Sequence, residues 1–314
     1  MHCRRFFSAL CLILAMFCLP HPAAALDGVT VVLSEEGGAY VQVADKLRAV
    51  LFQSGGAPRL PVKVIGLQEG SSLRADPGQL LVAVGTGAME ALAKKNLPQP
   101  VLSVLVPRAA FEKTARQSGR LGDRNFSAIT LDQPWTRQFS LIRHALPGRT
   151  KVGILLAPGS TELASELGAA AKAAGLVAII ETVDGDADLL PVLKRLLGES
   201  DVLLAVPDPL IYNRNTIQSI LLTTYRHQVP LLGFSPSYVK AGAIAAVFSV
   251  PEQIGQQAAE MIQALAAERR LPRPQPPRYF SVGVNAQVAR SLGIGLDDEV
   301  SLTNKLARTS GSEP

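Results

Sequence analysis

The stretch Val202-Leu-Leu-Ala-Val-Pro-Asp-Pro209 decides the fold of this chain. Five apolar residues are followed at once by turn-forming Pro-Asp-Pro. The arrangement returns in Val229-Pro-Leu-Leu-Gly-Phe-Ser235, where another apolar run is followed by Gly-Phe-Ser. Short apolar runs bounded by turn residues are typical of parallel strands that are buried on both faces. The two runs therefore predict strands of a sheet that helices cover.

Similar apolar runs recur along the chain and alternate with helical stretches. Further strands are predicted at 29–33, 62–65, 80–84, 101–104, 127–131, 151–155, 177–181, 243–247 and 279–284. The pattern restarts at Leu146-Pro147-Gly148, which divides the chain into two arrays of similar length. Strands that alternate with helices are the signature of parallel sheets covered by helices. We therefore predict an α/β protein with two lobes, each a parallel sheet flanked by helices.

The two arrays suggest the boundaries of the lobes. The N-terminal lobe is predicted at 26–131 and the C-terminal lobe at 151–270. Residues 271–278 contain four prolines and are expected to form a stiff hinge connector. The strand and helix at 279–296 are expected to return to the N-terminal lobe. The polar residues 303–314 are expected to be a disordered tail.

The clearest predicted helix runs from Pro251 to Arg269. Its apolar residues recur at helical spacing and form one face: Ile254, Ala258, Met261, Ile262 and Leu265. Ser249 and Glu252 have the spacing of a capping box at its start.

Residues 1–25 are typical of a secretory signal peptide. Arg4 and Arg5 precede an apolar stretch, and Ala23-Ala24-Ala25 offers small residues for cleavage. The apolar stretch, Phe6 to Leu19, is shorter than the roughly 20 residues of a membrane span, which disfavours the alternative of an uncleaved anchor. All three cysteines lie in this segment. We therefore expect a periplasmic protein without disulfides.

The composition excludes several classes of protein. Of the 314 residues, 47% are hydrophobic, which excludes disorder for the body of the chain. The formal net charge of +5 comes without a dense block of Lys and Arg, so no nucleic-acid partner is expected. Two of the four histidines, His2 and His21, lie in the signal segment, so no metal site is expected. The sequence implies no cofactor.

Candidate ligand-binding residues in the first array follow its strands, because open parallel sheets bind ligands beyond the carboxyl ends of their strands. Ser34 and Glu35 follow the first strand, where the acid is suited to a ligand's amino group. Gly85, Thr86 and Gly87 form a loop that permits close backbone approach and favours an anion such as a carboxylate. The alternative in each case is an ordinary turn from strand to helix.

The second array offers four further candidates of the same kind. Ser160 and Thr161 follow the strand at 151–155, Asp208 follows Val202–Val206, and Ser235 follows 229–232. Asp208 suits a ligand amine or hydroxyl, and the alternative is that it shapes the turn. We predict that the loops of the two lobes face each other across a cleft, with Asp208 at its floor.

No catalytic residues are predicted. The sequence has neither a G-x-S-x-G nucleophile elbow nor an H-E-x-x-H motif. Only His144 and His227 remain outside the signal segment, which disfavours a Ser-His-Asp triad. Recognition by backbone N–H groups and short polar side chains fits these loops better than proton transfer or nucleophilic attack.

Several segments, in their order along the chain, carry a resemblance to a known family. They are Gly85-Thr86, Val202–Pro209, Val229–Ser235, Val239-Lys-Ala-Gly-Ala243, Ile254-Gly-Gln-Gln-Ala258, Val284-Asn285 with Ala289, and Leu292-Gly293. This set resembles the substrate-binding proteins of ABC transporters, specifically the family with tryptophan- and tyrosine-binding members. The resemblance covers Leu80 to Leu296 and is clearest from Val202 onward.

The resemblance implies a periplasmic binding protein type 1 fold, in which a three-strand hinge joins two α/β lobes and ligand lies between them. Two ligand-facing segments depart from the family pattern. Where the family often has a Thr-Asp-Pro-like segment, this chain has Val104-Leu-Val-Pro-Arg108 without the acid. Ser34-Glu35-Glu36 also departs. The ligand class of known members is therefore not carried over.

These observations favour a periplasmic solute-binding component of an ABC-type importer. Its expected partners are a small organic solute, with amino-acid-like solutes among the candidates, and an inner-membrane ABC permease. Closure of the lobes would bury the solute. The alternatives are an enzyme on a similar α/β scaffold, because fold alone does not decide function, and a periplasmic sensor or accessory protein that binds a protein partner.

Overall fold

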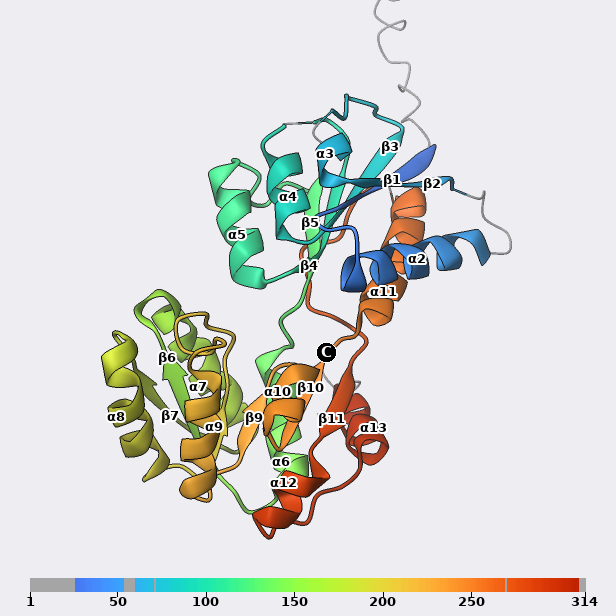
Figure 1. Cartoon of the computed structure of the whole chain (residues 1–314). Helices are drawn as coiled ribbons and strands as arrows, with labels where there is room; N and C mark the ends of the chain where they lie inside the picture. The colour runs from blue at the N-terminus through green and yellow to red at the C-terminus, as the bar shows by residue number, and fades with distance from the viewer. Residues whose placement is uncertain (1–25, 54–59, 71, 96, 269, 311–314) are drawn as a thin grey trace, which may run out of the picture.

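The structure, a computed structural model, describes residues 26–53, 60–70, 72–95, 97–268 and 270–310. The predicted signal peptide lies outside the described residues. The chain forms two α/β lobes (Figure 1), as the alternation of strands and helices predicts. Each lobe has its own sheet, and the lobes are joined by three crossings of the chain.

The first lobe contains a fully parallel sheet with the strand order β2-β1-β3-β4-β5. Its strands are β1 (Gly28–Leu33), β2 (Val62–Gly66), β3 (Gln79–Val84), β4 (Val101–Val106) and β5 (Phe126–Thr130). Its helices are α2 (Gly38–Gln53), α3 (Leu67–Gly70), α4 (Thr86–Ala93), α5 (Arg108–Gln117) and α11 (Pro251–Glu268). The inner strands are buried along nearly their whole length, which explains their almost uninterrupted apolar sequences.

The second lobe contains a sheet with the strand order β11-β10-β9-β8-β6-β7. Its strands are β6 (Lys151–Leu156), β7 (Val177–Thr182), β8 (Val202–Leu204), β9 (Leu231–Gly233), β10 (Ala245–Phe248) and β11 (Ser281–Val284). Its helices are α6 (Trp135–Ala145), the 3-10 helix η2 (Pro158–Leu163), α7 (Ala164–Ala173), α8 (Asp186–Leu197), α9 (Ile217–Arg226), α10 (Pro236–Ala241), α12 (Ala286–Ser291) and α13 (Glu299–Ser310).

The expected return of the last strand to the first lobe is wrong. β11 pairs antiparallel with β10 at the edge of the second sheet, with Ala245 opposite Val284. Asn285 supports this position, because its side-chain amide donates to the Val239 carbonyl at 2.8 Å. The final strand therefore completes the second lobe and makes its sheet mixed.

The element that returns to the first lobe is α11, which the sequence places at the end of the second. It packs along α2, and Ile254, Ala258 and Ile262 belong to the core of the first lobe (Figure 1). The proline-rich segment that follows stays with this lobe at first. The Gln275 N–H donates to the Ala128 carbonyl at 3.0 Å, beside β5. The segment crosses to the second lobe only after Gln275.

The expected disordered tail is also wrong in its described part. Residues 299–310 form α13, which packs on α6 and β11. Leu302 and Leu306 are fully buried in the second-lobe core, one turn apart on the same face. The polar composition hides this helix because only these two apolar residues are buried. Residues 311–314 lie outside the described residues.

Candidate ligand-binding site

A cavity of about 1170 Å³ lies between the lobes. The first lobe lines it with α5 and the loop after it, the second lobe with η2, α7 and the segment 206–210. Two of the segments that cross between the lobes also line it, with Asp132, Gln133 and Pro134 from one and Pro276 from the other. The cavity is somewhat larger than the roughly 300–1,000 Å³ of typical ligand pockets, so it has room for a small organic molecule.

The three crossing segments, 131–134, 249–250 and 276–280, are joined by a chain of hydrogen bonds. The Gln133 side-chain amide donates to Ser249 Oγ at 2.8 Å, and Ser249 Oγ donates to the Tyr279 carbonyl at 2.5 Å. Arg137 adds a second link, because its Nη1 donates to Gln133 Oε1 at 2.6 Å and to the Pro277 carbonyl at 2.9 Å. The crossings therefore form one connected hinge.

The predicted capping box of Ser249 and Glu252 is not formed, because the Ser249 side chain takes part in the hinge instead. The Ser249 hydroxyl is used between crossings, and the Val250 N–H at the start of α11 donates to Gln253 Oε1 at 3.0 Å. A serine close before a predicted helix indicates a cap, but that signal does not distinguish capping from a bond to a distant segment of the chain.

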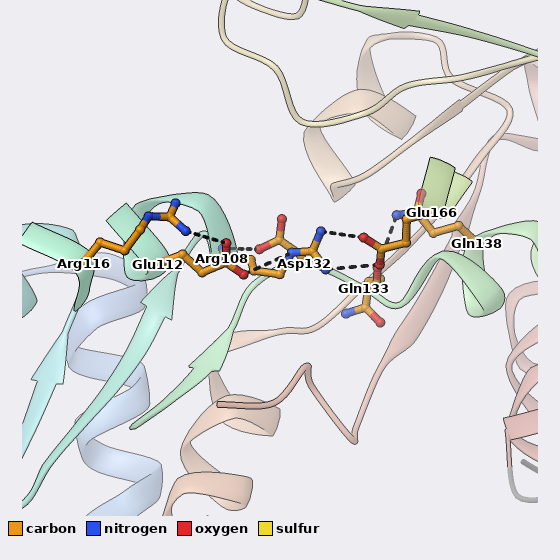
Figure 2. Close-up of polar contacts among 7 residues, drawn as sticks. All are labelled: Arg108, Glu112, Arg116, Asp132, Gln133, Gln138 and Glu166. Carbon is orange, nitrogen blue, oxygen red and sulfur yellow. Dashed lines mark hydrogen bonds and ion pairs between the residues drawn. The ribbon is translucent and has the colours of Figure 1, made fainter. Parts of the chain in front are cut away.

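In the part of the chain that the structure describes, one ion pair joins the two lobes across the cavity. The two Nη atoms of Arg108, at the start of α5, donate to the two carboxylate oxygens of Glu166 in α7 at 3.1 and 2.9 Å (Figure 2). The Arg108 backbone N–H donates to Asp132 Oδ2 at 2.6 Å. The hydrogen bond that Arg108 donates to Glu166 is the main cause that raises the pKa of Arg108 above its ordinary value. Because both side chains are partly exposed, the pair contributes little to stability.

Asp208 and Ser160 lie together in the second-lobe wall. Ser160 Oγ donates to Asp208 Oδ2 at 2.6 Å, and the Leu210 N–H donates to Asp208 Oδ1 at 2.9 Å. The Ala157 N–H lies 3.3 Å from Asp208 Oδ2. Asp208 is 7% exposed. The two predicted residues thus meet at the cavity, where the carboxylate also organises the loop.

The predicted residues of the first lobe lie elsewhere. Ser34, Glu35, Gly85, Thr86 and Gly87 do not occur among the lining residues of this cavity. Ser34 instead packs against the Gly85–Gly87 loop at the start of α4, where its Oγ accepts the Ala88 N–H at 2.8 Å. Gly85 has a φ of 91°, and a Cβ there would lie 2.5 Å from the Tyr40 ring. This glycine is therefore explained by close packing and positive φ rather than by ligand approach.

Two predicted residues of the second lobe also lie away from the cavity lining. Thr161 is exposed, and its hydroxyl donates to the Pro158 carbonyl at 3.1 Å. Ser235 directly precedes α10 and follows Phe234, whose ring contacts Tyr238 with centroids 4.3 Å apart.

Sequence reasoning missed Arg108, Gln133 and Glu166. Arg108 had a signal, because it follows β4 and thus satisfies the strand-end rule. Gln133 and Glu166 had none, because one lies in a crossing segment and the other inside α7.

Charge is unevenly divided between the walls of the cavity. The first-lobe wall has five arginines, Arg108, Arg116, Arg120, Arg124 and Arg273, and two acids, Glu112 and Asp123. The charged residues of the second-lobe wall are all acidic: Glu162, Glu166 and Asp208. Within the described part of the chain, no group of three or more His, Cys, Asp or Glu is placed to hold a metal ion.

Comparisons with known proteins agree with this architecture. The family model described as ABC transporter substrate binding protein matches residues 63–306. No curated protein matches the chain. Among the described residues, no helix is long and apolar enough to cross a membrane.

Solved structures share the fold at low sequence identity. A ligand-free, open substrate-binding protein with adhesive properties from Clostridium difficile has a TM-score of 0.67 and 14% identity over 87% of this chain and 96% of that one. An ABC domain from Streptococcus pneumoniae in complex with L-Trp has a TM-score of 0.58 and 16% identity over 88% and 97%. A conserved domain protein from Vibrio cholerae has a TM-score of 0.56 and 22% identity over 89% and 98%. The predicted two-lobed fold is confirmed.

Proposed function

Because this chain belongs to the family of ABC transporter substrate-binding proteins, we propose that it binds a small organic solute between its lobes and delivers it to an inner-membrane ABC permease. Amino-acid-like solutes are among the candidates, since one structural relative was solved with L-Trp. The role is recognition and transfer rather than chemical conversion.

The observation that carries this proposal is the cavity of about 1170 Å³, because both lobes and the crossings between them line it. A solute bound there would contact both lobes at once. Such a solute stabilises the arrangement in which the lobes approach each other, because only that arrangement allows both sets of contacts.

The hinge supports closure around the solute. Three crossings are tied together by Gln133, Ser249 and the Tyr279 carbonyl, so they are expected to move as a unit when the lobes rotate. Each lobe has its own core and is expected to move as a rigid body.

We also propose that the protein works in the periplasm after cleavage of residues 1–25. This follows from the sequence of that segment, which lies outside the described residues. N-terminal sequencing of the exported protein is expected to begin at or within a residue or two of Leu26. A full-length cytoplasmic product would contradict the proposed location.

A solute screen tests the proposed function. The chain without its signal segment is screened by thermal shift against amino acids, sugars, polyols and organic acids. A solute that binds only the folded state raises stability by about 2.7 kcal/mol at 100-fold excess over Kd. Small-angle scattering is expected to show compaction with that solute, and mass spectrometry to recover it unchanged. Turnover of the solute would favour an enzyme instead, and binding without compaction would remove the closing hinge.

A further inference from the structure

We infer that Arg108 determines specificity by binding a carboxylate group of the solute, and that Glu166 occupies this position in the present structure. The inference rests on the proposed function, because it assigns a ligand contact within the same cavity. It names the chemical class of the solute as an organic molecule with a carboxylate that reaches the first-lobe wall.

The geometry of Arg108 supports this role. Its guanidinium holds a carboxylate through two parallel hydrogen bonds, 3.1 and 2.9 Å long, inside the interlobe cavity (Figure 2). Two-pronged binding of this kind is how arginine recognises carboxylates of ligands. The Glu166 side chain therefore marks where a solute carboxylate fits.

Glu166 is suited to be displaced. Its side chain is 49% exposed, and its hydrogen bonds among the described residues go to Arg108 alone. An exposed pair of this kind is weak, because water screens the charges and both side chains lose freedom when they are held together. A solute carboxylate that gains further contacts in the cavity therefore competes with it successfully.

The backbone of Arg108, by contrast, is held in place by its neighbours. It begins α5, and its N–H donates to Asp132 at the hinge. β4 carries an irregular register between Val104 and Val106, with Leu105 at a φ of 54°. A leucine in this region is strained and persists only where its surroundings enforce it. This bend directly precedes Arg108, so the backbone that carries the guanidinium is fixed.

Three other acids that line the cavity, Asp132, Asp208 and Glu112, do not take the place of Glu166. Asp132 is bound to the Arg108 backbone N–H, and Asp208 accepts from Ser160 and Leu210. Glu112 lies at 3.9 Å from Arg108 Nε and also from Arg116, so it leaves the two Nη atoms to Glu166. Among the residues that the structure describes, Glu166 alone accepts hydrogen bonds from the two Nη atoms of Arg108, and a solute carboxylate can replace it.

The test compares acids with their uncharged amides. Isothermal titration calorimetry on the chain without its signal segment uses L-tryptophan, indole-3-acetate, phenylacetate and 4-aminobutyrate, each beside its primary carboxamide. At least one acid is expected to bind more tightly than its amide. Arg108→Gln is expected to lower the ratio of the Kd of the amide to the Kd of the acid by about tenfold or more, because a charged hydrogen bond is lost. Glu166→Gln is expected to tighten binding of the same acid.

Two further variants keep the result interpretable. Arg108→Lys retains the positive charge but not the paired donors of the guanidinium. Its preference for the acid over the amide is therefore expected to lie between those of wild type and Arg108→Gln. Lys113→Gln removes an exposed charge from the same helix away from the cavity lining and is expected to change nothing. Circular dichroism checks that each variant is folded.

Specific results would overturn the inference. If no acid binds wild type or Glu166→Gln more tightly than its amide, Arg108 is not a carboxylate site. If Arg108→Gln keeps the full preference, another group reads the carboxylate. If Glu166→Gln weakens binding, the pair is a latch between the lobes. A solute that binds equally as acid and amide would leave the proposed function intact while removing this inference.

Discussion

At the scale of single residues, the Asp208 carboxylate organises the loop that carries it. Its carboxylate accepts from Ser160 Oγ and from the Leu210 N–H, and the residue is almost fully buried. Asp208→Ala removes the acceptor of the Leu210 N–H, whereas Ser160 Oγ keeps the Ala157 carbonyl as a second acceptor at 3.1 Å. The free energy of unfolding is therefore expected to fall by about 1–3 kcal/mol. Urea denaturation measures this loss.

Two matched variants show whether the loss of stability in Asp208→Ala comes from the buried carboxylate. Asp208→Asn retains an acceptor and is expected to lose less stability than Asp208→Ala. Asp184→Ala removes an exposed acid of the same lobe and is expected to stay within about 0.5 kcal/mol of wild type. An Asp208→Ala protein as stable as the Asp184→Ala protein would show that the carboxylate does not organise its loop.

Asp201 makes a pH-dependent contribution to stability. Its Oδ2 accepts the N–H groups of Lys151 at 2.8 Å and Thr150 at 2.9 Å, and these bonds lower its pKa below the ordinary value of 3.8. A lowered pKa gives stability that is present above the ordinary pKa and is lost as the pH falls through the folded-state pKa.

Asp201→Asn is therefore expected to be less stable than wild type at pH 7. The difference should begin to shrink as the pH falls below about 4, because the unfolded wild type then takes up a proton at Asp201 while the folded form stays charged. It should close only below the lowered folded-state pKa of Asp201. Melting temperatures of the two proteins measured from pH 7 to pH 3 check this. A difference that is constant over the whole range would show that the charge of Asp201 is irrelevant.

At the scale of elements, the contact between α11 and α2 depends on Gly255. A Cβ at this position would lie 2.7 Å from the Val43 carbonyl oxygen and 2.9 Å from Lys46 Cβ. Gly255→Ala is therefore expected to push the helices apart and to destabilise the first lobe by about 1–3 kcal/mol. Chemical denaturation followed by far-UV circular dichroism measures the loss.

Gly168 in α7 is the matched control for this substitution. A Cβ there meets nothing within 4 Å. Gly168→Ala is expected to leave the protein equally stable or to stabilise it by about 0.4–1 kcal/mol, because alanine favours a helix. Equal effects of both substitutions would mean that α11 and α2 are not in close contact.

The elements themselves follow well from local sequence, but their partners do not. Apolar runs such as Val29–Leu33 are buried strands because their composition admits little else. The apolar face of α11 predicts that Ile254 and Ile262 are buried, yet periodicity does not specify which lobe covers them. The position of β11 likewise depends on a neighbour, β10, that pairs with it antiparallel.

The candidate site, likewise, could be predicted from local sequence only in part. Ser160 and Asp208 were predictable because the strand-end rule places their loops at one edge of a sheet. The cavity also needs the relative position of two lobes, and local sequence does not contain it. The bond between Arg108 and Glu166, 58 residues apart in the chain, therefore emerges only from the structure.

At the scale of the whole molecule, the described cores are separate. Val82 and Ile254 belong to a core of the first lobe, and Trp135 belongs to a core of the second. Trp135 is the single tryptophan of the chain and is 8% exposed. Its fluorescence therefore reports the unfolding of the second lobe.

This separation predicts that the lobes unfold as distinct units. Gly255→Ala is expected to shift the transition followed by circular dichroism more than the transition followed by Trp135 fluorescence. Leu306→Ala, in the core beside α6, should shift the fluorescence transition, by about 2–5 kcal/mol. Coincident shifts of both signals in both variants would show that the molecule unfolds as one cooperative unit.

The interleaved path of the chain also determines when each lobe is complete during synthesis. The first lobe needs α11, which ends at Glu268, and the second needs α13, which begins at Glu299. A ribosome adds about 5–20 residues per second and releases the N-terminus first. Neither lobe has all of its elements until nearly the entire polypeptide has been made. Late completion of both lobes discourages premature folding, which would suit the export proposed above, because a translocation channel admits only an unfolded polypeptide.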